Sequence, residues 1–110
     1  MPRAQIIIWV FILLLSGCAA EKRVERVPLP TETAETYFNR GVDASQKGDF
    51  KRAVSYYNKA IDVNPEFIVA YLNRGFVNEL LGKLENACAD WNMAFSLGQK
   101  EAEKYIKECK

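Results

Sequence analysis

Three cysteines are the residues of this 110-residue chain whose type and spacing are best suited to chemistry. Cys18 comes directly after the small residues Ser16 and Gly17, at the end of an apolar run. Cys88 and Cys109 lie in the C-terminal part. Two thiols in an exported chain can form a disulfide, because extracytoplasmic compartments are oxidising. Three cysteines are too few for a small domain built mainly on disulfides.

The remaining residues offer no catalytic set. The sequence contains no histidine, which removes the commonest general base and metal ligand. It also contains no glycine-rich phosphate loop and no metal-binding cysteine spacing. We expect four aspartates to be solvated charges: Asp43, Asp49, Asp62 and Asp90. We therefore predict a non-enzymatic protein that takes no metal and no cofactor.

The charge balance excludes a further class of protein. The chain has 15 basic and 14 acidic residues, with a net charge of +1. A nucleic-acid-binding protein should carry a clear basic excess, so we expect no nucleic-acid partner. The length fits one small domain.

The segment from Met1 to Ala20 has the order of a secretory signal peptide. Arg3 makes the start positive, Ile6–Leu15 is an unbroken apolar run, and small residues follow. As a helix, this run spans about 15 Å, roughly half of the ~30 Å hydrocarbon core of a bilayer. We therefore do not expect a stable membrane-spanning helix here.

The string Leu15-Ser16-Gly17-Cys18 resembles the lipobox of bacterial lipoproteins. The resemblance implies that residues 1–17 are removed and that Cys18 is acylated, which anchors the chain to a membrane. Ala19 stands where an aspartate commonly retains lipoproteins at the inner membrane, so it implies the outer membrane, facing the periplasm. Two alternatives are ordinary signal cleavage that leaves Cys18 free and an uncleaved signal anchor.

Residues 18–33 are expected to form a flexible tether. Charges of both signs alternate with valine, and Pro28-Leu29-Pro30 is incompatible with a helix. A soluble spacer is one interpretation of this segment. Contact with lipid headgroups is the other, through Lys22, Arg23 and Arg26.

From Ala34 onward the chain repeats itself at a fixed spacing. Identical residues recur in pairs: Tyr37/Tyr71, Asn39/Asn73, Arg40/Arg74, Gly41/Gly75, Gly48/Gly82, Ala53/Ala87, Asn58/Asn92 and Ala60/Ala94. A third copy begins with Ala102, Tyr105 and Ile106.

The spacing and the residue order resemble the tetratricopeptide repeat, whose period is about 34 residues. The resemblance covers residues 34–110, with repeats at 34–67 and 68–99 and a capping helix at 100–110. It implies an all-α fold of two helix-turn-helix repeats plus that cap, in which the first helices line a concave groove. Arg40 and Arg74 depart from the family pattern, which usually has leucine there.

Apolar periodicity independently predicts five helices, at about 34–47, 50–63, 67–81, 84–97 and 100–109. Gly48 and Gly82 supply the left-handed residue that ends the first helix of each pair. Four residues give the last helix one apolar face, as a terminal cap requires: Ala102, Tyr105, Ile106 and Cys109.

The resemblance assigns seven residues to the groove: Phe38, Asn39, Val42, Val69, Leu72, Asn73 and Phe76. Asn39 and Asn73 resemble the asparagine ladder that grips peptide backbones in some arrays; the alternative is that they solvate the groove or bond locally. We expect Leu72 and Phe76 to have no packing role and so to be available to a partner. The family's carboxylate clamp is not expected, because Phe38 and Val42 replace its polar residues.

Cys88 and Cys109 lie about equally far from the expected turn at Gly98-Gln99. In an antiparallel helix pair, such residues face each other, which favours a disulfide. Two buried free thiols are the alternative, because the rotation of the helices decides the distance.

The combined interpretation is a lipid-anchored protein–protein interaction module of the bacterial envelope. Its groove would bind a peptide or protein partner. The alternative is a structural lipoprotein that associates with itself as a homo-oligomer and has no separate ligand.

Overall fold

The computed structural model describes residues 32–109, which contain helices and no strand. The expected signal peptide, the lipid site at Cys18 and the tether up to Thr31 lie outside the described residues. The elements, in chain order, are α2 (Ala34–Gln46), α3 (Phe50–Val63), α4 (Ile68–Leu80), α5 (Leu84–Ser96), η1 (Lys100–Ala102) and α6 (Glu103–Ile106). The ends of α2, α3, α4 and α5 agree with those of the predicted helices to within one residue.

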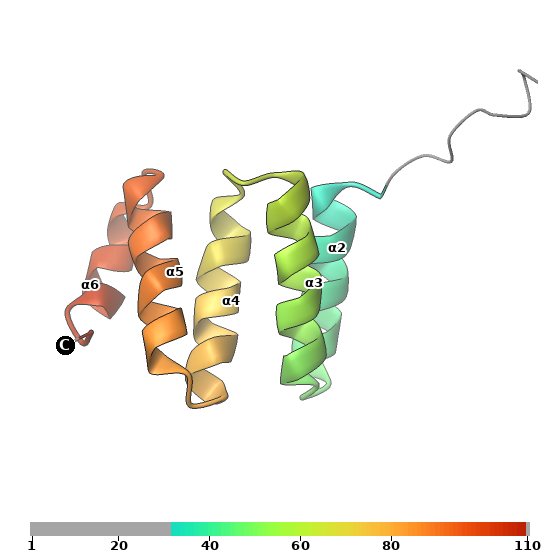
Figure 1. Cartoon of the computed structure of the whole chain (residues 1–110), viewed down its shortest axis with the longest axis horizontal. Helices are drawn as coiled ribbons and strands as arrows, with labels where there is room; N and C mark the ends of the chain where they lie inside the picture. The colour runs from blue at the N-terminus through green and yellow to red at the C-terminus, as the bar shows by residue number, and fades with distance from the viewer. Residues whose placement is uncertain (1–31, 110) are drawn as a thin grey trace, which may run out of the picture. The chain divides into compact units, whose positions relative to one another are not determined.

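Glycine turns join the helices of each pair. Gly48 has a φ of +80° and Gly82 a φ of +78°, so both adopt the left-handed conformation that the sequence predicted. After the first turn, the Asp49 side chain accepts a hydrogen bond from the Arg52 backbone N–H and caps α3. The turns place α2 antiparallel to α3 and α4 antiparallel to α5, with α4 packed on α3 (Figure 1).

Each helix pair is held closely by a glycine under an aromatic ring. A Cβ atom on Gly41 would lie 2.5 Å from Cε1 of Tyr57, and one on Gly75 would lie 2.5 Å from Nε1 of Trp91. Tyr57 and Trp91 are the largest fully buried side chains of residues 32–109. The sequence period therefore repeats a physical contact: a ring from the second helix lies on the bare backbone of the first.

The last helix is shorter than predicted. We expected a helix over residues 100–109, but the structure has the 3₁₀ turn η1 followed by one turn of α-helix that ends at Ile106. The backbone N–H of Cys109 donates to the carbonyl of Ile106 (2.8 Å), which turns the chain away from the helix axis. The segment still covers the array, because Ala102 is fully buried and the Tyr105 ring packs on Phe76.

The helices of residues 32–109 are too short or too polar to cross a membrane.

Candidate functional site

A shallow hollow of about 230 Å³ lies on the side of the array where α2 and α4 are neighbours. Three of the seven residues that the sequence assigned to the groove line it: Val42, Asn73 and Phe76. Five further residues complete the lining: Ser45, Gln46, Tyr57, Val77 and Leu80. Leu80 is 65% exposed, so a large apolar side chain stands in solvent at the rim.

The other four predicted groove residues lie outside this lining. Phe38 packs on the rings of Tyr57 and Phe67, with centroids 5.8 and 5.3 Å away. Leu72 packs against the buried cluster around Tyr71. Asn39 and Val69 are exposed.

The expectation that Leu72 and Phe76 lack a packing role was wrong. Phe76 lies 5.7 Å from Trp91 and 4.8 Å from Tyr105, measured between ring centroids, and Trp91 and Tyr105 are 5.5 Å apart. The three rings join α4, α5 and α6 at a separation typical of favourable aromatic pairs. The short α6 supplies Tyr105 to this cluster, and that contact occupies one side of Phe76.

The lining of the hollow carries no charged residue. Burial raises the pKa of the Tyr57 hydroxyl, and the Asn73 side chain partly offsets this effect. The phenol therefore stays neutral around pH 7. Hydroxyl and amide groups from Ser45, Gln46 and Asn73 supply donors and acceptors beside the apolar surface.

The most buried charged group of residues 32–109 lies elsewhere, between α4 and α5. Asp90 is only 4% exposed and accepts two hydrogen bonds from Arg74, at 2.9 Å from Nε and 2.6 Å from Nη2. Arg74 also donates to the Asn58 side chain on α3 (2.8 Å). The hydrogen bond to Asp90 raises the pKa of Arg74 further, so the guanidinium group stays charged. The side chains of Asn58, Arg74 and Asp90 thus link three helices.

Our expectation of a solvated Asp90 was therefore wrong, whereas Asp43, Asp49 and Asp62 are exposed as expected. The reason is Arg74, which brings a guanidinium group into the space between the helices where the family pattern usually has leucine. This departure from the pattern was the available signal, because a cation in an interior position needs a carboxylate.

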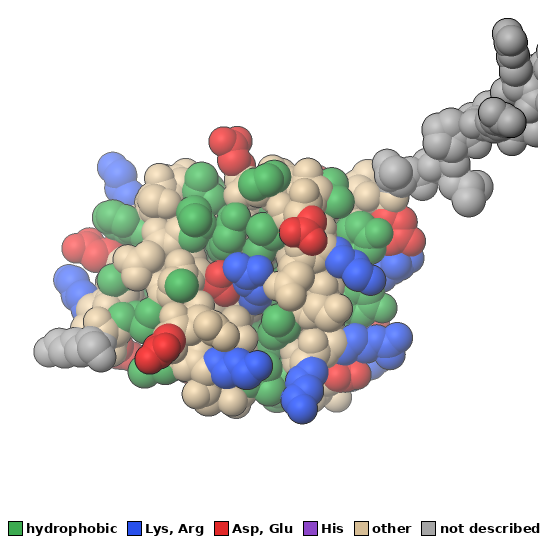
Figure 2. Space-filling view, in the orientation of Figure 1, with side chains coloured by type: hydrophobic (Ala, Val, Ile, Leu, Met, Phe, Trp, Pro, Cys, Tyr) green, Lys and Arg blue, Asp and Glu red, His purple; other side chains and the backbone are tan. Residues whose placement is uncertain are grey.

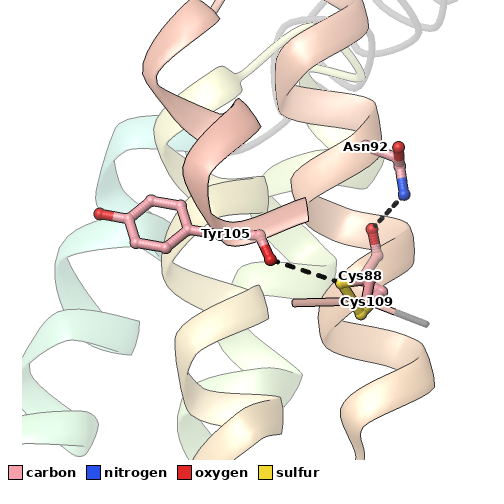
Figure 3. Close-up of a disulfide and its surroundings, with 4 residues drawn as sticks. All are labelled: Cys88, Asn92, Tyr105 and Cys109. Atoms are coloured by element: carbon pink, nitrogen blue, oxygen red, sulfur yellow. Dashed lines mark hydrogen bonds between the residues drawn. A yellow bond between two sulfur atoms is a disulfide. The ribbon is translucent and has the colours of Figure 1, made fainter. Parts of the chain in front are cut away.

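The structure joins Cys88 of α5 and Cys109 by a disulfide, with Cα atoms 5.8 Å apart (Figure 3). The Cys109 sulfur lies 3.6 Å from the Tyr105 carbonyl oxygen, and the Asn92 amide donates to the Cys88 carbonyl (2.9 Å). The link fixes the chain beyond α6 to the start of α5. Residues 32–109 hold no cluster of three or more acidic or cysteine side chains able to bind a metal ion.

Comparison with known proteins bears on the repeats. Residues 34–67, which form α2, α3 and the turn that follows, match the family described as "Tetratricopeptide repeat". The helices of residues 34–106 have a tetratricopeptide-like repeat arrangement. The predictions of an all-α fold and of this repeat are confirmed.

The chain is similar to proteins of several organisms. It is 41% identical over 54 residues to an uncharacterized protein of Methanocaldococcus jannaschii, covering 49% of this chain and 63% of that protein. It is 33% identical over 95 residues to the Tetratricopeptide repeat protein 36 homolog of Nematostella vectensis, covering 81% of this chain and 52% of that protein. It is 30% identical over 93 residues to the Protein SGT1 homolog of Oryza sativa subsp. japonica, covering 83% of this chain and 25% of that protein. The chain thus spans less than two thirds of the length of each of these relatives. The expected absence of enzymatic activity therefore stays a prediction.

Proposed function

We propose that the tetratricopeptide array is a protein-interaction module that binds an uncharged, apolar segment of a partner in the hollow between α2 and α4. The observation that carries this proposal is the lining: apolar side chains and neutral polar groups, with no lysine, arginine, aspartate or glutamate. A charged group would lose its hydration there without gaining a counter-charge.

The size and polarity of the hollow suggest how the partner binds. A volume of about 230 Å³ suits one large side chain rather than a small-molecule ligand, since ligand pockets usually measure about 300–1,000 Å³. The amides of Gln46 and Asn73 can each donate to and accept from a peptide backbone. The partner is then a peptide segment with one leucine-like or aromatic side chain.

A peptide selection tests this function. The full chain, purified in mild detergent, is used to select binders from a displayed library of short random peptides. We expect enrichment of apolar, uncharged sequences that lose binding to the variant Leu80→Asp. The matched control is Leu84→Asp, because Leu84 is also an exposed leucine (48%) but lies outside the hollow.

Enrichment of acidic or basic peptides would contradict the proposal. So would equal binding to both variants.

We further propose that a lipid on Cys18 anchors this module in the bacterial envelope, at the outer membrane and facing the periplasm. The support is the Leu15-Ser16-Gly17-Cys18 string after the apolar run and the Ala19 that follows it. An anchor at the start of a tether would leave the array free to meet its partner near the membrane.

A further inference from the structure

The second repeat shows what a repeat of this chain receives from the helix before it. Tyr71 is 7% exposed and packs with Ile61 of α3, and its hydroxyl donates to the Pro65 carbonyl (2.8 Å). Arg74 lies over the Tyr71 ring, 5.6 Å from its centroid, and bonds to Asn58 of α3. The receiving surface of a repeat is therefore an aromatic ring beside a cation.

The first repeat has the equivalent surface on α2 and α3, but no helix of residues 32–109 precedes α2 to cover it. Tyr37 and Arg40 are the equivalents of Tyr71 and Arg74, one repeat earlier. The Arg40 side chain is 47% exposed, against 22% for Arg74. A hollow of about 550 Å³ opens beside it, lined by Arg40, Asp43, Ala44, Lys47, Asp49, Arg52 and Tyr56.

One difference between the repeats changes the charge of this surface. The first repeat has Tyr56 where the second has the buried Asp90. Lys59 lies 5.8 Å from the Tyr37 ring centroid and 5.7 Å from that of Tyr56, and Arg52 lies 5.9 Å from the Tyr56 centroid. We call these residues the N-terminal edge: Tyr37, Arg40, Arg52, Tyr56 and Lys59.

Of the three cations of the N-terminal edge, Arg40 has a carboxylate partner among the described residues, whereas Arg52 and Lys59 have none there. Glu32 binds Arg40 with both carboxylate oxygens, at 2.7 and 2.8 Å. Within residues 32–109, no carboxylate lies within 4 Å of the Arg52 or Lys59 side-chain nitrogens. Figure 2 shows Lys and Arg side chains on the α2–α3 side of the array with acidic side chains interspersed, so the surplus of positive charge at the N-terminal edge is confined to the Arg52 and Lys59 side chains.

We propose that the N-terminal edge docks an amphipathic helix of a partner protein that carries carboxylates opposite Arg52 and Lys59. The internal interface supplies the shape, because α3 already presents Val54, Asn58 and Ile61 to the same surface of the second repeat. The charge supplies the chemistry, because the edge offers two cations over aromatic rings that no carboxylate of residues 32–109 pairs with. This site is separate from the hollow between α2 and α4 and does not depend on the function proposed for it.

Two synthetic peptides test the proposal. Both carry the α3 sequence, residues 50–63, held helical by a side-chain staple on the opposite face. One has Ser55→Glu and Asn58→Glu, and the other has Ser55→Lys and Asn58→Lys. Binding to the full chain in detergent is measured by fluorescence anisotropy at low and high salt.

We expect the Glu peptide to bind at least about tenfold tighter than the Lys peptide and to weaken with salt. The chain variant Arg52→Glu/Lys59→Glu should reverse this order. A misfolded variant would lose both peptides rather than exchange them. The matched control Lys100→Glu/Lys107→Glu changes two exposed cations of the cap region and should leave the order unchanged.

Three results would overturn the proposal. The first is an unchanged order of the two peptides on the edge variant, and the second is no saturable binding of either peptide. The third is a homodimer whose photocrosslinks join Tyr56 of two copies, because a second copy would then occupy the edge.

Discussion

Asp90 and Tyr56 occupy equivalent positions of the two repeats, and this one difference gives the repeats different interiors. In the second repeat, a buried carboxylate meets Arg74, whose side chain is 22% exposed. In the first, Arg40 meets Glu32 at the surface, where the side chains are 47% and 38% exposed. The same arginine position thus offers a buried and an exposed ion pair in one molecule.

Replacing Asp90 should be costly. Asp90→Asn leaves Arg74 partly buried without a counter-charge, so we expect the free energy of unfolding to fall by about 3 kcal/mol. Urea denaturation measures this change. The matched control is Glu32→Gln, which removes the exposed carboxylate and should cost at most about 1 kcal/mol. Equal losses in the two variants would contradict the assignment of Asp90 to the interior.

The contact between Gly75 and Trp91 makes a second prediction at this scale. Gly75→Ala should gain up to about 1 kcal/mol of helix propensity, but the new methyl group would meet the indole at 2.5 Å. We expect a net loss of about 1–3 kcal/mol in the free energy of unfolding, since neither backbone nor ring can move freely. The same substitution in a Trp91→Phe background should cost less, and strict additivity of the two changes would refute the contact.

At the scale of elements, the cap stands out because α6 has only four residues. So short a helix is not stable by itself, since nucleation costs more than one turn returns. Its place depends on three contacts: the burial of Ala102, the aromatic cluster around Tyr105, and the bond from Cys109 to Cys88.

The disulfide should therefore contribute measurably to stability. It joins residues that are 21 positions apart in the sequence, and Cys88→Ser/Cys109→Ser should lower the free energy of unfolding by about 3 kcal/mol through the gain in unfolded-chain entropy. Thiol titration of the denatured, unreduced mature protein checks the bond itself. We expect neither residue to react, and two reactive thiols would show that they are not joined.

At the scale of the whole molecule, the repeat period was sufficient to predict the long helices, because glycine turns and the ring-on-glycine contact recur with it. The pairing of Arg74 with Asp90 was not predictable in this way, because it lies at positions where the repeats differ. The cap was predicted too long, since apolar spacing does not reveal a chain that turns at Ile106 to bring Cys109 to α5. The groove was predicted in part: Val42, Asn73 and Phe76 line the hollow, whereas Phe38 and Leu72 pack into the array.

The anchoring of the whole chain also gives a testable expectation. Cys18→Ser should leave the precursor unprocessed or release a soluble protein, because the acylated residue is lost. Membrane fractionation and the intact mass of the mature chain measure the outcome. Cys88→Ser/Cys109→Ser serves as the control and should fractionate with membranes like the parent. An unchanged mature mass and an unchanged distribution in Cys18→Ser would exclude lipid modification.

The bond between Cys88 and Cys109 also makes the two ends of the array mechanically unequal. A repeat array under tension comes apart from its ends, since each repeat contacts only its neighbours. A pulling force cannot lengthen the segment inside the covalent loop, whereas α2 is held to the array by noncovalent packing on α3. Load applied through the tether is therefore expected to peel α2 away first, while α5 and the cap extend last.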